Sequence, residues 1–180
     1  MNGYILTPTI FEPSKRSPVV MSHYSGPGSQ AVLDKWTIDW EYYLVSKGFI
    51  VACVDGRGTG GRSRAYETSV YMQLGKLETE DQVAGAEYMR TLPYVDDKHI
   101  GIYGWSYGGY ETLMAMSTSN GTYQAGVAIA PVTDWRYYDT IYAERFMRTP
   151  NENNEGYEQS APITHAEKLK GDLLIISGTA

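Results

Sequence analysis

Short apolar segments alternate along the chain with longer segments in which apolar residues recur every three or four positions. The short segments are rich in β-branched residues and are bounded by Gly, Pro or polar residues, which predicts strands at residues 17–24, 49–54, 99–103, 125–130 and 173–176. The longer segments predict helices at residues 34–47, 78–90, 108–117 and 138–147. The remaining Gly-rich residues 56–61 and polar residues 151–160 are interpreted as loops.

This order of elements predicts an α/β fold. Strands that are apolar throughout and connected by helices form a mostly parallel sheet with helices on both faces. Functional residues of such sheets gather in the loops at the carboxyl ends of the strands. Only Ser177, Gly178, Thr179 and Ala180 follow the last predicted strand. We therefore expect the sequence to cover part of a sheet and to end before its last strand.

The composition and charge of the chain exclude several kinds of protein and of binding site. Of 180 residues, 42% are hydrophobic and 20% are charged, which is enough for one domain with a core. The formal net charge of −6 argues against a nucleic-acid-binding surface, and no apolar run reaches the roughly 18 residues that a membrane helix needs. The single cysteine, Cys53, excludes an internal disulfide and a multi-cysteine metal site.

No metal site is predicted from the other ligand types either. The three histidines lie far apart in the sequence and lack the spacing of metal ligands on one helix face. The acidic residues Glu78, Glu80 and Asp81 fit the solvated first turn of a helix, where carboxylates complement the helix dipole.

The segment Gly104-Trp105-Ser106-Tyr107-Gly108 has the G-x-S-x-G pattern of a nucleophile elbow. It follows a predicted strand and opens a predicted helix, and its glycines avoid the clashes that side chains would cause in a sharp turn. Such a turn lifts the serine hydroxyl out of the sheet and leaves the next backbone N–H free for an oxyanion. The alternative interpretation is an N-cap serine at a Gly-rich helix start.

A second glycine motif points to a different class, a nucleotide-binding oxidoreductase. Gly56, Gly58 and Gly61 follow a strand that ends at Asp55 and satisfy the pattern G-x-G-x-x-G. That fingerprint needs a helix at the third glycine and then a strand that ends in an acidic residue. Residues 62–68 have no helical apolar stripe, and the next predicted element is a helix. We therefore interpret the glycines as a tight loop after a strand.

Several motifs together resemble a known family. The segments, in fixed order, are YSGPGSQ at 24–30, DGRGTG at 55–60, GWSYGGY at 104–110, APVTDW at 130–135 and YDTIYAER at 138–145. They are similar to the α/β-hydrolase domain of the dipeptidyl peptidases, in the prolyl oligopeptidase family of serine peptidases. The resemblance covers nearly the whole sequence and implies an α/β-hydrolase fold.

The resemblance implies a role for each matching residue. Ser106 matches the nucleophile that forms an acyl-enzyme, and the backbone N–H of Tyr107 and the phenol of Tyr24 match the two oxyanion donors. The walls of an apolar pocket for proline at the penultimate substrate position match Val132, Trp135, Tyr138 and Tyr142. A helix through Tyr138 and Tyr142 would place both rings on one face. Without the resemblance, this pair would be interpreted as core packing.

The implied activity is the release of Xaa-Pro dipeptides from peptide N-termini, with no cofactor. The family places its catalytic Asp and His beyond the position of Ala180 and a β-propeller ahead of this domain, so we expect residues 1–180 alone to be inactive. An internal acid and base, Asp134 and His165, are the less favoured arrangement. The family also implies a homodimer of the full-length protein and a periplasmic or other extracytoplasmic location.

Two other functions stay open. The same fold serves other hydrolases, such as an acylaminoacyl peptidase or an esterase, because fold alone does not set the substrate. The chain could also be a hydrolase-like module without catalytic activity that only binds partners.

Overall fold

The computed structural model describes residues 1–12, 14–36 and 39–178. These residues form a six-stranded sheet with the strand order β1-β3-β2-β4-β5-β6. The strands are β1 (Asn2–Leu6), β2 (Ser17–His23), β3 (Ile50–Asp55), β4 (Val95–Trp105), β5 (Ala125–Ile129) and β6 (Asp172–Ile176). Strands β2 to β6 pair in parallel, whereas β1 is antiparallel to β3 at one edge. The prediction of an α/β fold with a mostly parallel sheet is confirmed.

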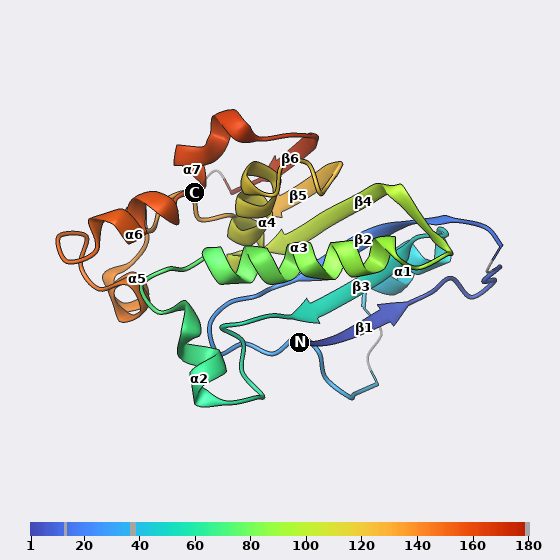
Figure 1. Cartoon of the computed structure of the whole chain (residues 1–180), viewed down its shortest axis with the longest axis horizontal. Helices are drawn as coiled ribbons and strands as arrows, with labels where there is room; N and C mark the ends of the chain where they lie inside the picture. The colour runs from blue at the N-terminus through green and yellow to red at the C-terminus, as the bar shows by residue number, and fades with distance from the viewer. Residues whose placement is uncertain (13, 37–38, 179–180) are drawn as a thin grey trace.

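Helices lie on both faces of the sheet and beyond one end of it. The α-helices are α1 (Glu41–Ser46), α2 (Arg64–Glu67), α3 (Lys76–Arg90), α4 (Tyr107–Thr118), α5 (Thr140–Met147), α6 (Asn154–Gln159) and α7 (Pro162–His165). Short 3-10 turns are η1 (Thr68–Val70), η2 (Trp135–Tyr137) and η3 (Ala166–Lys168). In Figure 1, α2, α5 and α6 lie beyond the carboxyl ends of the parallel strands, at the left. In the described part of the chain, no helix is long and apolar enough to cross a membrane.

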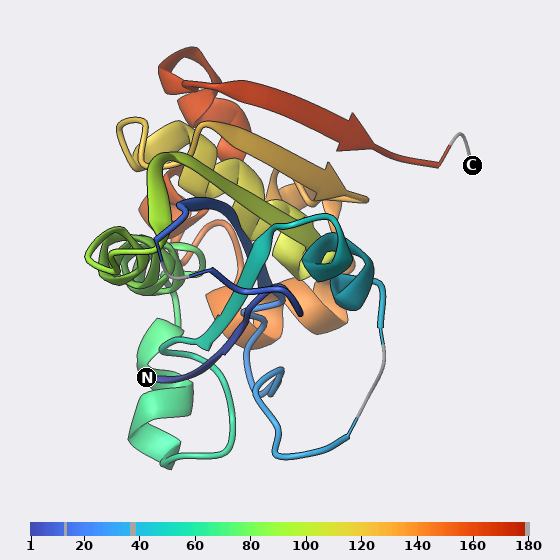
Figure 2. The same ribbon diagram turned by 90° about the vertical axis from the view of Figure 1, so that its right-hand side faces the viewer.

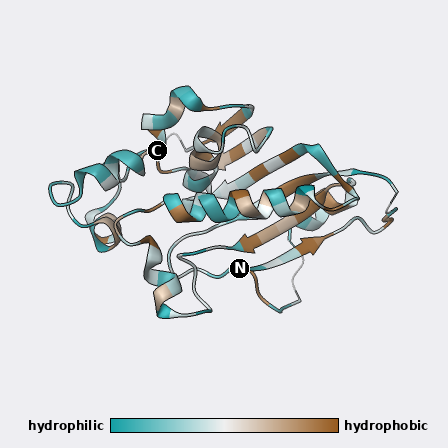
Figure 3. Ribbon diagram, viewed as in Figure 1, coloured by the Kyte–Doolittle hydropathy of each residue, from teal (hydrophilic) through white to brown (hydrophobic). Residues whose placement is uncertain are grey.

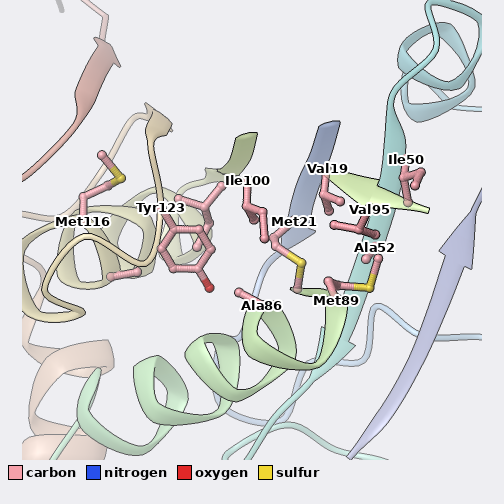
Figure 4. Close-up of a cluster of buried hydrophobic side chains, with 12 residues drawn as sticks. Val19, Met21, Ile50, Ala52, Ala86, Met89, Val95, Ile100, Met116 and Tyr123 are labelled. Atoms are coloured by element: carbon pink, nitrogen blue, oxygen red, sulfur yellow. The ribbon is translucent and has the colours of Figure 1, made fainter. Parts of the chain in front are cut away.

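The main core lies between the sheet and the helices α3 and α4. Ala86 and Met89 of α3 point toward Met21 and Ile100 on the strands, and Met116 of α4 extends the same cluster (Figure 4). All five side chains are at most 2% exposed. The central strands are rich in hydrophobic residues, whereas α3 alternates between hydrophilic and hydrophobic residues (Figure 3). This pattern is what packing of one helix face on a buried sheet requires.

Helix α1 lies on the opposite side of the strands from α3 (Figure 2). Its Glu41 accepts hydrogen bonds from the hydroxyls of Tyr4 on β1, at 2.9 Å, and Ser22 on β2, at 2.5 Å. The ring of Trp40 meets that of Tyr103 on β4 edge-on, with 4.4 Å between centroids. Contacts with three strands therefore hold this short helix in place.

The prediction of a helix over residues 34–47 is wrong at its N-terminal end. Helix α1 spans only Glu41–Ser46, and residues 37–38 of the predicted helix lie outside the described residues. The side chain of Trp36 is 88% exposed, so an added N-terminal turn of helix there would bury little apolar surface. Aromatic residues are weak helix formers, and a short helix without packing is unstable.

Three further elements differ from the sequence prediction. The helix predicted at 138–147 begins at Thr140, because Asp139 caps it and Tyr138 is extended. The polar loop predicted at 151–160 contains helix α6, which has one buried residue, Tyr157, and therefore no apolar stripe to detect. Strand β1 was not predicted, because five largely exposed edge residues carry little periodicity.

Candidate active site

Ser106 lies between β4 and α4 in a strained backbone conformation. Its φ is 59° and its ψ is −114°, a region that residues with a side chain rarely adopt. Its backbone N–H donates to the carbonyl of Ile129 at the end of β5, at 2.8 Å. The side chain of Ser106 makes no capping hydrogen bond to α4. The geometry is therefore that of a nucleophile elbow and departs from that of an ordinary N-cap serine.

The glycines of the motif are required by close backbone contacts. A Cβ atom on Gly108 would lie 2.6 Å from the carbonyl oxygen of His23, and one on Gly109 would lie 2.5 Å from that of Ile129. A Cβ atom on Gly104 would meet the backbone of Gly108. These three positions let α4 approach the ends of β2 and β5, which is what makes the turn at Ser106 sharp.

Two donors predicted for an oxyanion lie at the same end of the sheet. Tyr107 is the first residue of α4, so its N–H has no partner within the helix. Tyr24 follows β2, the strand beside β4, and is 40% exposed. The rings of Tyr24 and Tyr107 are 6.2 Å apart between centroids. A Cβ atom on Gly26 would lie 2.5 Å from the Tyr24 ring, so this glycine lets the turn pass beneath the phenol.

The four predicted pocket residues lie in one aromatic cluster. The rings of Trp135 and Tyr142 are stacked at 5.7 Å with an interplanar angle of 21°. Tyr138 meets both rings edge-on, at 5.8 Å from Trp135 and 5.5 Å from Tyr142. Val132 packs against the same cluster. Trp135 is 1% exposed, whereas Tyr138 is 43% exposed, so the cluster has a buried base and an open side.

Tyr138 and Tyr142 come together in a different way from the one predicted. Their spacing of four residues was interpreted as one face of a helix, but Tyr138 precedes α5 with φ −96° and ψ 168°. The carboxylate of Asp139 accepts from the backbone N–H of Tyr142, at 2.8 Å. This cap begins the helix after Tyr138, so the extended residue turns its ring back across Tyr142.

The ring of Tyr107 belongs to this cluster as well, which the sequence analysis missed. It lies 5.5 Å from Trp135 and 5.1 Å from Tyr110 between centroids, and the residue is 2% exposed. The residue after the serine therefore contributes its backbone to the elbow and its side chain to the aromatic cluster. The only sequence signal for this was its aromatic type.

Asp134 and His165, the internal alternative for an acid and a base, are engaged elsewhere. The Asp134 carboxylate accepts from the backbone N–H of Arg136 at 2.8 Å and from its guanidinium at 3.0 Å. His165 directs Nε2 to the carbonyl of Gln159, at 2.9 Å. Both residues stabilise the segment between β5 and β6.

The other two histidines also have local partners. His23 is buried between Ser25, at 3.1 Å, and Thr112, at 3.3 Å, and burial lowers its pKa to about 3. His99 pairs with Asp96 at 2.7 Å in the first half of β4, away from the end that leads to Ser106. Among the described residues, none of the three histidines hydrogen-bonds to Ser106.

The loop at 56–61 does not have the geometry of a dinucleotide site. Its third glycine, Gly61, opens no helix, and the next helix, α2, begins at Arg64 after an N-cap at Ser63. The carboxylate of Asp55 is bound to the backbone N–H groups of residues 31 and 32, at 3.1 and 2.8 Å. Over residues 1–12, 14–36 and 39–178, no group of three or more His, Cys, Asp or Glu residues could hold a metal ion.

The prediction of a solvated acidic helix start is wrong for two of its three residues. Glu78 is 1% exposed and Asp81 is 8% exposed. Asp81 binds the guanidinium of Arg57 at 2.8 Å, and the more exposed Glu80 binds it at 2.9 Å. Glu78 instead accepts a hydrogen bond from the hydroxyl of Tyr107, at 2.8 Å. The first turn of α3 therefore faces α4, which its acidic composition did not reveal.

Comparisons with known proteins identify the family. A model of the prolyl oligopeptidase family matches residues 36–180. The chain is 46% identical over 177 residues to the probable dipeptidyl-aminopeptidase B of Ajellomyces dermatitidis and 47% identical over 177 residues to that of Talaromyces marneffei. These alignments cover 96% of the chain but only 19% and 20% of the two relatives.

The chain is also similar to solved structures of dipeptidyl peptidases. The crystal structure of Porphyromonas gingivalis dipeptidyl peptidase 4 matches 99% of this chain with a TM-score of 0.97 and 56% identity, over 25% of its own chain. A putative dipeptidyl aminopeptidase IV from Bacteroides ovatus matches 97% of this chain with a TM-score of 0.94 and 40% identity, over 25% of its own chain. The chain therefore spans about a fifth to a quarter of the length of these relatives.

Proposed function

Because the chain belongs to the prolyl oligopeptidase family of serine peptidases, we propose that it is the catalytic part of a dipeptidyl peptidase that releases Xaa-Pro dipeptides through an acyl-enzyme on Ser106. The family resemblance of the sequence motifs is confirmed. The strained elbow at Ser106, beside a cluster of four aromatic rings, is the observation that carries the proposal.

The proposed reaction begins with attack by Ser106 Oγ on the carbonyl carbon of the second substrate residue. A general base takes the hydroxyl proton, and the carbonyl oxygen becomes an oxyanion. The backbone N–H of Tyr107 and the phenol of Tyr24 donate to this oxyanion. The C–N bond then breaks, the base returns the proton to the leaving amine, and the dipeptidyl ester on Ser106 is hydrolysed by water.

The general base is proposed to be a histidine other than the three present here. Each of these has its own local partner, and burial keeps the pKa of His23 far below neutrality. The chain covers about a fifth to a quarter of its relatives, and a longer protein has room for the base and its acidic partner. Residues 1–180 alone are therefore expected to show negligible turnover.

Proline selectivity is proposed to come from the aromatic cluster. Trp135, Tyr138 and Tyr142 present flat, rigid rings at fixed angles, and Val132 adds an aliphatic wall. A pyrrolidine ring is compact and apolar, so it buries well against such surfaces without a polar partner. The same cluster gives no reason to favour the ester or acylated substrates of other hydrolases with this fold.

The full-length protein tests this function. We expect it to cleave Gly-Pro-p-nitroanilide, to be labelled by a fluorophosphonate probe and to lose both properties in Ser106→Ala. Lack of labelling would support the non-catalytic module. Labelling together with a preference for acylated or ester substrates over Gly-Pro-p-nitroanilide would support another hydrolase.

A further inference from the structure

The phenol of Tyr107 ties the active-site elbow to a buried carboxyl group on a different helix. Its hydroxyl donates to Oε1 of Glu78, in the first turn of α3, at 2.8 Å. The backbone of Tyr107 forms the start of α4 beside Ser106, while its ring packs between Trp135 and Tyr110. A tyrosine side chain has two rotatable bonds, so a fixed phenol restricts the backbone that carries it.

Glu78 is not placed there as a salt-bridge partner. It is 1% exposed, and its second oxygen, Oε2, has no hydrogen-bond partner among the described residues. The guanidinium of Arg57, on the loop after β3, binds Asp81 and Glu80 instead. Burial of a carboxylate without a cation costs free energy unless hydrogen bonds compensate for the lost hydration. For Glu78, the side-chain hydrogen bond that does so comes from Tyr107.

A second buried carboxyl group, Glu111 on α4, influences the charge of Glu78. It is 0% exposed, accepts a hydrogen bond from Thr79, and has no partner for Oε2 among the described residues. Burial and the nearby charge of Glu78 raise the pKa of Glu111 well above its ordinary value. Burial and the charge of Glu78 thus both favour the protonated form of Glu111, and a protonated Glu111 leaves Glu78 as the carboxyl group of the pair that carries charge.

Several other titratable groups surround Glu78. Tyr107, Tyr110 and Glu111 face it from α4, Asp81 lies on its own helix, and Tyr142 of α5 is close enough to respond to its charge. Burial is the largest cause that raises the pKa of Glu78, to about 7, and its bond with Tyr107 opposes the rise. Glu78 thus changes charge within the range in which peptidases are assayed.

We propose that Glu78 is a positioning residue for catalysis, which holds the Tyr107 phenol and through it fixes the backbone N–H that stabilises the oxyanion. This inference rests on the proposed peptidase function. Ionised Glu78 makes a charge-assisted hydrogen bond, which is roughly twice as strong as a neutral one. When Glu78 is protonated, or replaced by glutamine, the bond is neutral and the elbow is held less firmly.

The test compares full-length wild type, Glu78→Gln and Tyr107→Phe with Gly-Pro-p-nitroanilide between pH 5.5 and 9. Glu78→Gln should lower kcat about threefold to tenfold at pH 9, with little change in the inhibition constant of the product Gly-Pro. The ratio of wild-type to Glu78→Gln kcat/KM should fall toward one below about pH 7. Titration of the catalytic base is common to both proteins and cancels in this ratio.

A double-mutant cycle separates positioning from a general structural effect. In a Tyr107→Phe background, the step from Glu78 to Gln should change kcat less than twofold, because the bond is already absent. Glu87→Gln removes a carboxylate from the exposed side of the same helix and should leave kcat unchanged. Melting temperatures within a few degrees of wild type would show that the variants fold.

Three results would overturn the inference while leaving the peptidase function intact. They are a Glu78→Gln enzyme with wild-type kcat at pH 9, a rate ratio that does not vary with pH, and full additivity with Tyr107→Phe. Failure of the wild type to cleave the substrate or to be labelled at Ser106 would instead overturn the proposed function.

Discussion

The rings of Trp135 and Tyr142 lie nearly parallel, 5.7 Å apart, although one follows β5 and the other belongs to α5. The arrangement is held by two caps: Asp134 accepts from the backbone N–H of Arg136, and Asp139 accepts from that of Tyr142. The aromatic cluster is thus built by local turns that lie between strands, away from the sheet itself.

Truncation of Tyr142 should remove proline selectivity more than general hydrolysis. In the full-length protein, we expect Tyr142→Ala to lower kcat/KM for Gly-Pro-p-nitroanilide by about 10- to 100-fold, since one wall of the slot for the pyrrolidine ring is lost. Labelling of Ser106 by a fluorophosphonate probe should change less than threefold. Tyr137→Ala, at an 80% exposed neighbouring position, is the matched control. Unchanged proline preference would point to another hydrolase.

Addition of one methyl group to the elbow should inactivate it. In Gly108→Ala the new Cβ would lie 2.6 Å from the backbone carbonyl of His23, and we expect a loss of about 3 kcal/mol in stability together with loss of probe labelling. Gly48→Ala is the control, because Gly48 has a φ of 93° but no atom within 4 Å of the new Cβ. That substitution should cost about 1–2 kcal/mol, from the left-handed backbone alone, and leave labelling intact. Equal costs would contradict the steric explanation.

Burial of His23 should weaken the fold in acid. Its pKa is about 3 in the folded state, lowered by burial from 6.5, so between these values the unfolded chain binds a proton that the folded chain does not. Stability should fall as the pH drops from 6.5, by up to about 3 kcal/mol at pH 4.5 from this group alone. Urea unfolding of His23→Gln should lack this component, whereas the exposed His99→Gln should retain it. Parallel pH profiles for wild type and His23→Gln would refute the assignment.

Burial of Glu111 should lower the stability of the fold as the pH rises, which is the opposite of the effect of His23. Burial raises its pKa in the folded state, whereas the unfolded carboxyl group ionises at its ordinary value. The folded chain therefore holds a proton that the unfolded chain has released, and stability falls as the pH rises through this interval. Glu111→Gln cannot titrate, so its melting temperature should rise relative to wild type between pH 4 and pH 8. A constant difference across that range would show that Glu111 is ionised in the fold.

Local rules explain which features could be predicted from the sequence. The elbow could be predicted because the turn at Ser106 leaves no room for a Cβ atom at two fixed positions, and the sequence has glycine at both, Gly104 and Gly108. The order of strands and helices followed from alternating periodicities, which depend on neighbouring residues.

Features that depend on packing between distant segments were missed. Glu78 looks like an ordinary acidic helix start, and only the approach of α4 shows that it is buried against Tyr107. Tyr138 has helical spacing from Tyr142, yet helix α5 begins only after the Asp139 cap, so Tyr138 lies outside it. Trp36 fits a helical stripe but has nothing to pack against. For Glu78 and Trp36 a tertiary contact, or its absence, overrides a local preference, whereas for Tyr138 one local signal, the Asp139 cap, overrides another, the helical spacing.

The hydrogen bond from Ser106 to Ile129 extends the ladder between β4 and β5 by one step, beyond the last strand pair of Trp105 and Ile129. The backbone of Ser106 is therefore held by the sheet, and its strained conformation cannot relax while the register of these two strands holds. We therefore expect the elbow to melt only when the pairing of β4 and β5 is lost, so that Ser106 keeps its backbone conformation for as long as these strands stay paired.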